Sequence, residues 1–491
     1  MQSVAKHLAC GSNSIVRIGD SQARCFAALC MTFYFANDSP LKKLLLPLLA
    51  LSALATPALA QTGTTQNANR IDGYGAPVSP AVPVSRAAGE TTIDIIGGYY
   101  QQTGSHGAVE GGRGTQQLTD VSPAIVVNVP LDTVSRLSVN VGADFYASAS
   151  TDRIDFALST PSANDVRVHG DFGYSREQKA KGTIWGAGVG VSKEYDYLSF
   201  SATASFAKTS QDGNRQLSVA GQVFLDKVTL ITPLELRTYS GAPNGKSQYG
   251  TDTRQTYNFS VTYSQVLSKR LQAAISTELV SQNGLLSTPF HRVYFRDNPA
   301  QNTIPTLNDN FISRFATAAR IENLPRARFK YPISLRLNYY ASDLVQVRGF
   351  YRFYNDNFGI TAHTLELELP VKVTPFFVVY PFYRYHTQTA ASYFAPFAQH
   401  SVADQYYTSD YDLAALTAHK AGLGLRYSPV YGIGRFHVPG KNAQGLPRVM
   451  RLKSLDLRYA HYQQLGSTIY AVGDRADLIA NVIGFDLGFA L

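Results

Sequence analysis

Residues Val345–Tyr385, VQVRGFYRFYNDNFGITAHTLELELPVKVTPFFVVYPFYRY, decide the fold. The stretch contains three runs in which apolar and polar side chains alternate, and a period of two is typical of β-strands. Asn355–Asn357 with Gly359 separate the first two runs, and Thr374-Pro375 separate the last two. Because these are turn-forming residues, the pattern predicts two consecutive hairpins.

The two faces of these runs differ in a way that decides the environment. One face carries Leu, Val, Phe and Tyr side chains. The other face carries Arg348, Arg352, Glu366, Glu368, Arg384 and His386. Such charges would be costly in a soluble core, whereas a membrane barrel turns apolar side chains to lipid and polar ones to water. The predicted fold is all-β: a transmembrane antiparallel up-and-down β-barrel of about 16 strands (14–18) with long extracellular loops.

The composition agrees with this fold class. The 491 residues are 45% hydrophobic and only 16% charged, with 30 Tyr, 26 Phe, one Trp and 38 Gly. No linker divides Thr92–Leu491, so we predict a single barrel over 92–491. The net charge of +9 is mild, and no run of Lys and Arg predicts a nucleic-acid partner.

Three segments precede the barrel. Leu41–Ala60 has a basic start, a short apolar run and Ala58-Leu59-Ala60 before Gln61, which predicts a signal peptide cleaved between Ala60 and Gln61. Residues 1–40 are predicted to be an upstream extension, with translation starting at Met31 or Leu41. All three Cys lie in residues 1–60, so the secreted chain has no cysteine chemistry.

Residues 61–91 are rich in Pro, Gly, Ser, Thr and Ala and show no periodicity. They predict a disordered periplasmic lead-in rather than a folded plug. Secretion, strands and the absence of an apolar run long enough for a membrane helix together predict the outer membrane of a Gram-negative bacterium. The expected partners there are outer-membrane lipid and the assembly machinery.

The strand count depends on one segment. Alternating runs give 16 strands if Val166–Tyr174 lies in a loop and 17 if it spans, and an even number is expected for a bacterial barrel. This count treats Leu217–Leu225 and Val228–Leu236 as separate strands. Long connections are predicted at Gln282–Arg328 and Thr387–Asp412 on the outside, and parity places the long Ser428–Pro447 connection on the periplasmic side.

The last run, Ile479–Leu491, alternates to the end of the chain. Phe485, Leu487, Phe489 and Leu491 share its apolar face. A terminal strand of this kind resembles the signal read by the outer-membrane assembly machinery, although the last residue there is usually aromatic and here is Leu491. We therefore predict that these four residues form the assembly signal.

The charged face predicts a ladder on the inner wall. With a turn at Asn355–Phe358, Arg348 is expected near Glu366 and Arg352 near Ala362, with Arg384 and His386 beside them. Such a ladder either tunes which solutes pass or braces the barrel by pairing charges. The sequence leaves both functions open.

Other clusters predict no chemistry. Asp152, Asp155 and Asp165 near Asp144 lack the spacing of a calcium loop, and we expect a solvated loop with no metal. The glycine-rich Ser105–Thr115 lacks the ending of a phosphate-binding loop. An enzyme would need Ser, His and an acid within hydrogen-bond reach; His386 with Asp404, or His291 with Ser287, are the candidate pairs, but neither pair carries a nucleophile motif. We expect no catalytic residue and no cofactor.

Several long segments resemble one family. YRFYNDNFGITAHTLELELPVK, YPFYRYHTQTAASYFAPF and YYTSDYDL lie within Tyr351–Asp412, and YYQQTGSHGAVEGGRGTQQLTD, GADFYASASTDRIDF and GLLSTPFHRVYF lie earlier. They resemble the domain-of-unknown-function 3570 family of bacterial outer-membrane β-barrels, over nearly all of Thr92–Leu491. The family's genes lie near those for periplasmic flavinylation and thioredoxin-like proteins. The resemblance therefore implies a periplasmic redox partner, and it supplies no catalytic residues.

Three functions follow as hypotheses. A pore for small polar solutes requires an open lumen lined by the charged ladder. A non-conducting docking barrel for a periplasmic or surface redox partner requires a blocked lumen and contacts through Ser428–Pro447 or the outer loops. A barrel enzyme requires Ser, His and an acid converging at one rim.

Overall fold

The computed structural model describes residues 90–107, 111–112, 114–147, 164–233, 236, 250–297, 319–441, 445, 447–466 and 475–491. The chain divides into two compact units. One comprises residues 57–435 and 450–491, and the other comprises residues 1–56 with 436–449. Among the described residues, no helix is long and apolar enough to cross a membrane. The predicted extension, signal peptide and most of the lead-in lie outside the described residues.

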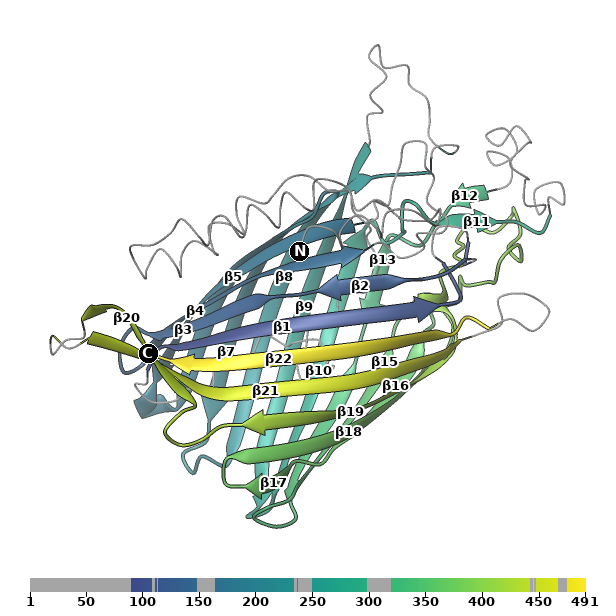
Figure 1. The fold of residues 1–491 in the computed structure, drawn as a ribbon. Helices are drawn as coiled ribbons and strands as arrows, with labels where there is room; N and C mark the ends of the chain where they lie inside the picture. Colours follow the sequence, from purple (N-terminus) through teal and green to yellow (C-terminus); the bar gives the residue numbers. More distant parts are fainter. Residues whose placement is uncertain are drawn as a thin grey trace, which may run out of the picture. The chain divides into compact units, whose positions relative to one another are not determined.

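The larger unit is a closed antiparallel barrel of 16 strands, as the sequence predicted (Figure 1). The first half consists of β1 (Thr92–Gly104), β2 (Leu118–Val121) with β3 (Ala124–Pro130), β4 (Ser135–Ala147), β5 (Asn164–Gln178), β6 (Thr183–Lys193), β7 (Tyr197–Thr209), β8 (Arg215–Leu230) and β9 (Gly250–Ser268). The second half consists of β10 (Leu271–Gly284), β13 (Ala327–Lys330) with β14 (Ile333–Tyr340), β15 (Gln346–Asn355), β16 (Thr361–Glu368) with β17 (Val371–Thr374), β18 (Phe377–Gln388), β19 (Leu416–Tyr427), β21 (Pro447–Gly466) and β22 (Leu478–Ala490).

The first and last strands close the barrel. β1 and β22 pair antiparallel along their full lengths, from Thr92 opposite Ala490 to Gly104 opposite Leu478. Four shorter elements lie outside this ring: the 3-10 helices η2 (Lys179–Lys181) and η5 (Tyr411–Leu413), and the two-stranded sheet of β11 (Arg292–Tyr294) with β12 (Ala319–Ile321). The last element, β20 (Gly434–Lys441), lies mostly within residues of the smaller unit.

Proline interrupts three of the barrel strands. β2 ends before Pro123, β13 before Pro332 and β16 before Pro370, and each is continued by the next short strand. Proline has no N–H to donate to a ladder, so pairing lapses at these points. Their carbonyls still accept hydrogen bonds: Ala143 N donates to Pro123 O, Glu278 N to Pro332 O and Gln346 N to Pro370 O, each at 3.0 Å.

In β16 the apolar side chains are exposed and the charged ones are buried, the reverse of a strand in a soluble protein. Leu365 and Leu367 are 55% and 45% exposed, whereas Glu366 and Glu368 are 6% and 3% exposed. The leucines therefore face outward and the carboxylates inward. The same alternation leaves Phe172, Phe200 and Phe259 exposed on the outer surface of other strands. Apolar side chains outside and polar ones inside are the arrangement of a membrane barrel.

The connections differ at the two ends of the barrel. At one end, here called the turn end, β1 begins, β22 finishes, and most adjacent strands are joined by short turns such as 341–345. At the other end, here called the loop end, long segments such as 285–326 and 389–415 join the strands. The chain leaves β19 at Tyr427, at the turn end, so the 428–446 connection starts at the same end as the termini of the barrel.

The predicted number of 16 strands is confirmed, but two segments of the chain contribute to it differently from the prediction. Val166–Tyr174 spans the barrel as part of β5, which the sequence left open. Leu217–Leu225 and the first residues of Val228–Leu236 form one strand, β8, without a turn at Asp226-Lys227. Asp226 interrupts the apolar pattern, but its carboxylate faces inward and accepts a hydrogen bond from Arg254 Nε at 2.9 Å, so the strand continues.

Candidate functional site: the inner wall

The predicted ladder lies on the inner wall, but with a different register. Arg348 lies opposite Glu368 rather than Glu366, and Arg352 lies opposite Thr364 rather than Ala362. The cause is the turn, which occupies Asp356–Ile360 after the last pair, Asn355 with Thr361. The turn begins one residue later than predicted, at Asp356 instead of Asn355, and has five residues instead of four, and both changes move the cross-strand partners along the second strand.

Two ion pairs form within the ladder. Arg348 Nη1 lies 2.7 Å from Glu368 Oε1. Arg384 Nη1 lies 3.9 Å from Glu366 Oε2 on the neighbouring strand. His386 is engaged locally, because its Nδ1 lies 2.9 Å from Thr364 Oγ1 and its Nε2 lies 3.4 Å from Gln388 Oε1. The structure therefore brings the predicted residues together on one wall, β15–β16–β18.

Three cations that the sequence analysis missed extend this wall. One cross-strand row runs from Arg336 through Phe350, Glu366, Arg384 and Lys420 to Tyr462. Arg458 lies on β21 among the same inward-facing residues. We call the following set the cationic patch: Arg336, Arg348, Arg352, Arg384, Lys420 and Arg458. The sequence does contain a signal for Arg336: it lies between Leu335 and Leu337, so the alternation of the strand predicts that Arg336 faces inward when the two leucines face outward.

One aromatic ring supports the patch from the turn-end side. The Arg458 guanidinium lies 3.7 Å from the centroid of the Phe382 ring, which is a cation–π contact. The Phe382 ring covers Gly422, where a Cβ atom would lie 2.3 Å from the ring. Only glycine admits the ring this close to the backbone, so Gly422 leaves room for the Phe382 ring that contacts Arg458.

The opposite wall carries acidic side chains. Tyr146 Oη lies 3.1 Å from both Asp165 Oδ2 and Glu194 Oε2, and Arg167 lies 3.5 Å from Asp144 and 3.7 Å from Glu194. Asp165 thus belongs to a hydrogen-bonded network, whereas Asp152 and Asp155 lie outside the described residues. Within the residues that the structure describes, no group of three His, Cys, Asp or Glu side chains is placed to hold a metal ion.

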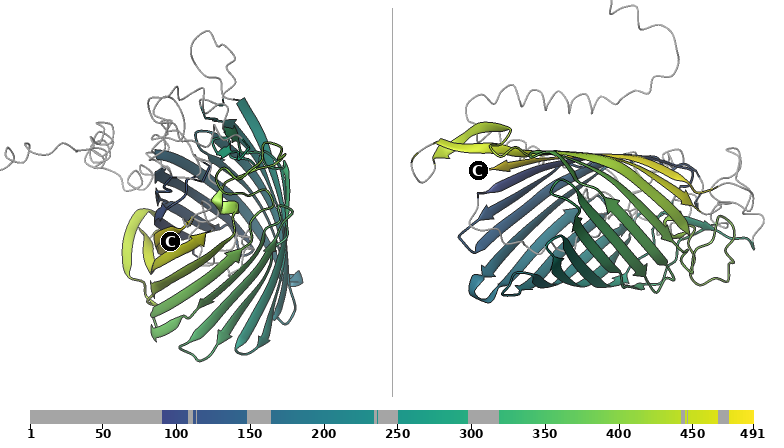
Figure 2. Two further views of the ribbon diagram at one scale, coloured as in Figure 1. Left: turned by 90° about the vertical axis from the view of Figure 1, so that its right-hand side faces the viewer. Right: turned by 90° about the horizontal axis from the view of Figure 1, so that it is seen from below.

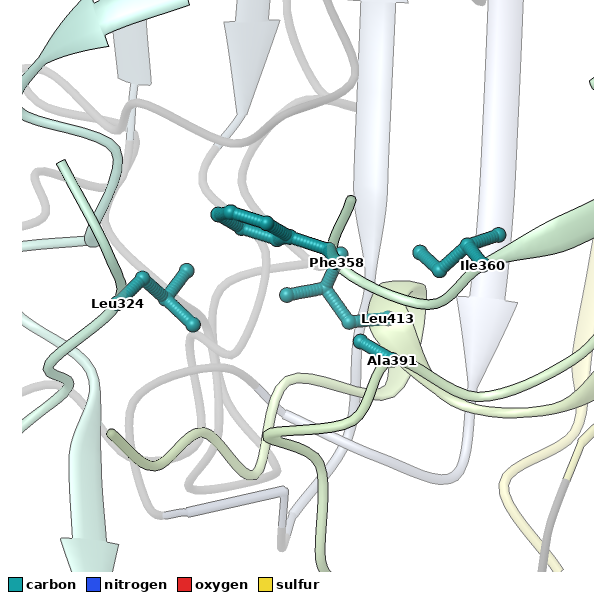
Figure 3. Close-up of a cluster of buried hydrophobic side chains, with 5 residues drawn as sticks. All are labelled: Leu324, Phe358, Ile360, Ala391 and Leu413. Atoms are coloured by element: carbon teal, nitrogen blue, oxygen red, sulfur yellow. The ribbon is translucent and has the colours of Figure 1, made fainter. Parts of the chain in front are cut away.

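The loop end carries a packed assembly, here called the loop-end cap and formed by 285–297, 319–326, 356–360 and 389–415. Figure 3 shows one of its apolar clusters: Leu324, Phe358, Ile360, Ala391 and Leu413. A second cluster joins Val293, Phe295 and Tyr407. Figure 2 (left) shows the 389–415 segment over part of the ring of strands. The long loops therefore bury a core of their own, which the sequence did not predict.

A buried carboxylate ties the cap together. Glu322 is 4% exposed, and its side chain accepts hydrogen bonds from Thr288 N at 2.6 Å and from Thr408 Oγ1. Desolvation, with the charge of Asp410 added, raises the pKa of Glu322. Burial therefore favours the protonated, uncharged form of the Glu322 carboxyl group.

We expect the cap to loosen as the pH rises. A raised pKa in the folded state means that the contribution of Glu322 is fully present below the ordinary glutamate pKa of about 4.3 and is lost as the pH rises through the raised value. Hydrogen–deuterium exchange of 389–415, corrected for the intrinsic rate, should accelerate with pH. Glu322→Gln should remove the slope; an unchanged slope in this variant would assign it to another group.

The residue pairs considered for an enzyme are engaged elsewhere. Asp404 lies 3.4 Å from His400, while His386 contacts Thr364 and Gln388. The Ser287 hydroxyl accepts a hydrogen bond from Leu324 N at 2.8 Å, and His291 Nε2 accepts one from Ser409 N at 3.3 Å. These contacts belong to the loop-end cap and to the inner wall.

The comparison with known families gives the identity. The family model described as "Protein of unknown function (DUF3570)" matches residues 51–431, which is more than half of the chain. The chain belongs to this family. The match ends before β21 and β22, so it covers less of the C-terminal region than the resemblance of individual segments implied. A comparison with curated protein sequences gave no significant match.

Solved structures similar to this DUF3570 protein are outer-membrane proteins. A bacterial polysaccharide outer membrane secretin is 10% identical with a TM-score of 0.40, covering 83% of this chain and 100% of that one. The ferric enterobactin receptor PfeA is 11% identical with a TM-score of 0.42, covering 82% and 61%. The outer membrane protein OpdK from Pseudomonas aeruginosa is 8% identical with a TM-score of 0.35, covering 81% and 99%.

Proposed function

We propose that this protein is a pore for small polar solutes in the outer membrane of a Gram-negative bacterium. The observation that carries the proposal is the reversed distribution of side chains: leucines on the outside of β16 and ionised side chains on its inside. A wall that pairs its charges and keeps its cations half-exposed suits passage of hydrated solutes.

The test is single-channel recording of the protein purified from outer membranes and reconstituted in a planar bilayer. We expect steady conductance steps, because a polar wall lets ions pass. A heat-modifiable, folded barrel that remains silent would contradict the pore. Asymmetric addition of protein gives insertions of one orientation and so shows whether the current depends on the loop end.

One observation favours a second function, a non-conducting docking barrel. The loop-end cap has buried apolar clusters, and a cap of this kind suits a mouth that is closed by its own loops. The family resemblance supplies the partner class, a periplasmic or surface redox protein. Cross-linking in intact cells followed by a pull-down tests this function in a barrel without conductance. An enzyme is the third and weakest alternative, because the considered Ser, His and Asp side chains are engaged in structural contacts.

A further inference from the structure

The inner wall formed by β10 to β21 carries more positive than negative side chains. Its inward-facing cations are the six residues of the cationic patch together with Arg328, Lys330 and Arg426, and its inward-facing acids are Glu278, Glu366, Glu368 and Asp456. All six residues of the cationic patch are half-buried, so none of them is sealed within the wall. This imbalance remains after the two ion pairs of the ladder have formed.

The depth of the groups separates the charges further. In the pair Arg348–Glu368 the arginine side chain is 29% exposed and the glutamate 4%, and in the pair Arg384–Glu366 the values are 23% and 6%. The carboxylates therefore lie beneath the guanidinium groups. A solute in the lumen meets the cations first, and the surface it meets is more positive than the count of residues suggests.

Two cations lie directly opposite each other on neighbouring strands. Arg384 on β18 is paired in register with Lys420 on β19, and Glu366 is on the far side of Arg384. Like charges at opposing positions destabilise a sheet. A bound anion between the two side chains would remove this cost, and the guanidinium fork matches the paired oxygens of a carboxylate or phosphate.

We propose that the cationic patch is a binding site for small oxyanions and that it makes the pore selective for anions. The inference deepens the proposed pore function and rests on it for the selectivity, whereas the binding site stands on the wall alone. The shared chemistry of the ligand is a compact group with two or more charged oxygens. A carboxylate and an inorganic phosphate are the two forms to be distinguished.

Reversal potentials under a salt gradient test the selectivity. We expect anions to pass in preference to cations, and the double variant Arg384→Glu, Lys420→Glu to lower the anion-to-cation permeability ratio by about tenfold or more, since each reversal moves two units of charge within several ångströms of the path. Lys269→Glu makes the same type of change in the exposed β9–β10 turn and should leave the ratio unchanged. Arg384→Lys keeps the charge and should keep the preference.

Titration calorimetry with sodium phosphate and sodium acetate, on the full protein in a zwitterionic detergent, tests the site without conductance. Binding that the double variant weakens by about tenfold, and that Lys269→Glu does not change, supports the patch, and the tighter ligand identifies the form of the oxyanion. A conducting protein without anion preference overturns the selectivity and leaves the pore. A silent protein overturns the pore, while calorimetry still decides the site: no binding of either anion overturns it.

Discussion

Replacement of Asp356 by alanine is expected to cost about 3–5 kcal/mol of unfolding free energy, because it removes one partner of a buried ion pair. The Asp356 side chain is fully buried and that of Arg328 is 14% exposed. Arg328 Nε donates to Asp356 Oδ2 at 2.8 Å, and Tyr354 Oη donates to the same oxygen at 2.7 Å. The other oxygen accepts from Phe358 N and Ile360 N, each at 3.0 Å.

Urea unfolding in detergent micelles, followed by tryptophan fluorescence and by heat modifiability, measures this loss. Asp356→Asn keeps an acceptor for the two turn amides and should lose less than Asp356→Ala. Asp343→Ala is the matched control, since Asp343 is exposed in the 341–345 turn, and it should change stability little. Equal losses for Asp356→Ala and Asp343→Ala would show that the buried pair does not hold the β15–β16 turn.

Replacement of Leu367 by lysine is expected to destabilise the barrel by about 2–4 kcal/mol, the cost of a lysine on the lipid face near mid-depth. Leu367 is 45% exposed on the outer surface of β16. Reversible unfolding in lipid vesicles, rather than in detergent alone, gives the value, because the penalty arises from the hydrocarbon.

Two variants define the meaning of this result. Leu344→Lys makes the same exchange in the 341–345 turn, where the leucine is 59% exposed, and should cost about 0–1 kcal/mol because the turn lies outside the hydrocarbon. Glu366→Lys changes the inner wall and should alter ion preference more than insertion into lipid. If Leu367→Lys and Leu344→Lys were equally tolerated, the outer face of β16 would not contact lipid.

The barrel could be predicted because the alternation of apolar and polar residues within each strand identifies its outer and its inner face. In β16 Leu365 and Leu367 alternate with Glu366 and Glu368, and the structure places the leucines outside and the carboxylates inside as expected. The register of Arg348 could not be predicted in the same way. It depends on where the turn begins and on how many residues it has, and Asp356 stabilises the observed turn by accepting hydrogen bonds from two amides inside it.

The rest of the site lies beyond local patterns. Lys420 and Arg458 come from strands that follow long connections, and only the pairing of β18 with β19 and of β19 with β21 brings them near Arg384. The loop-end cap combines segments on both sides of β15 and β16, and the carboxylate of Glu322 finds its partner Thr408 86 residues away. The segments around Glu322 and Thr408 show no periodicity from which this contact could be predicted, because their side chains pack from irregular backbone.

The pairing of β1 with β22 also means that the barrel can close only after β22 is in place. Hairpins between neighbouring strands close short loops, but β1 meets its last partner only when the C-terminal residues Leu478–Ala490 arrive. Until then two rows of backbone N–H and C=O groups remain open to any other strand. The pairing between the strands most distant in sequence, which has the largest entropic cost of loop closure, is thus also the one that ends this exposure. A chain truncated before β22 would keep both edges.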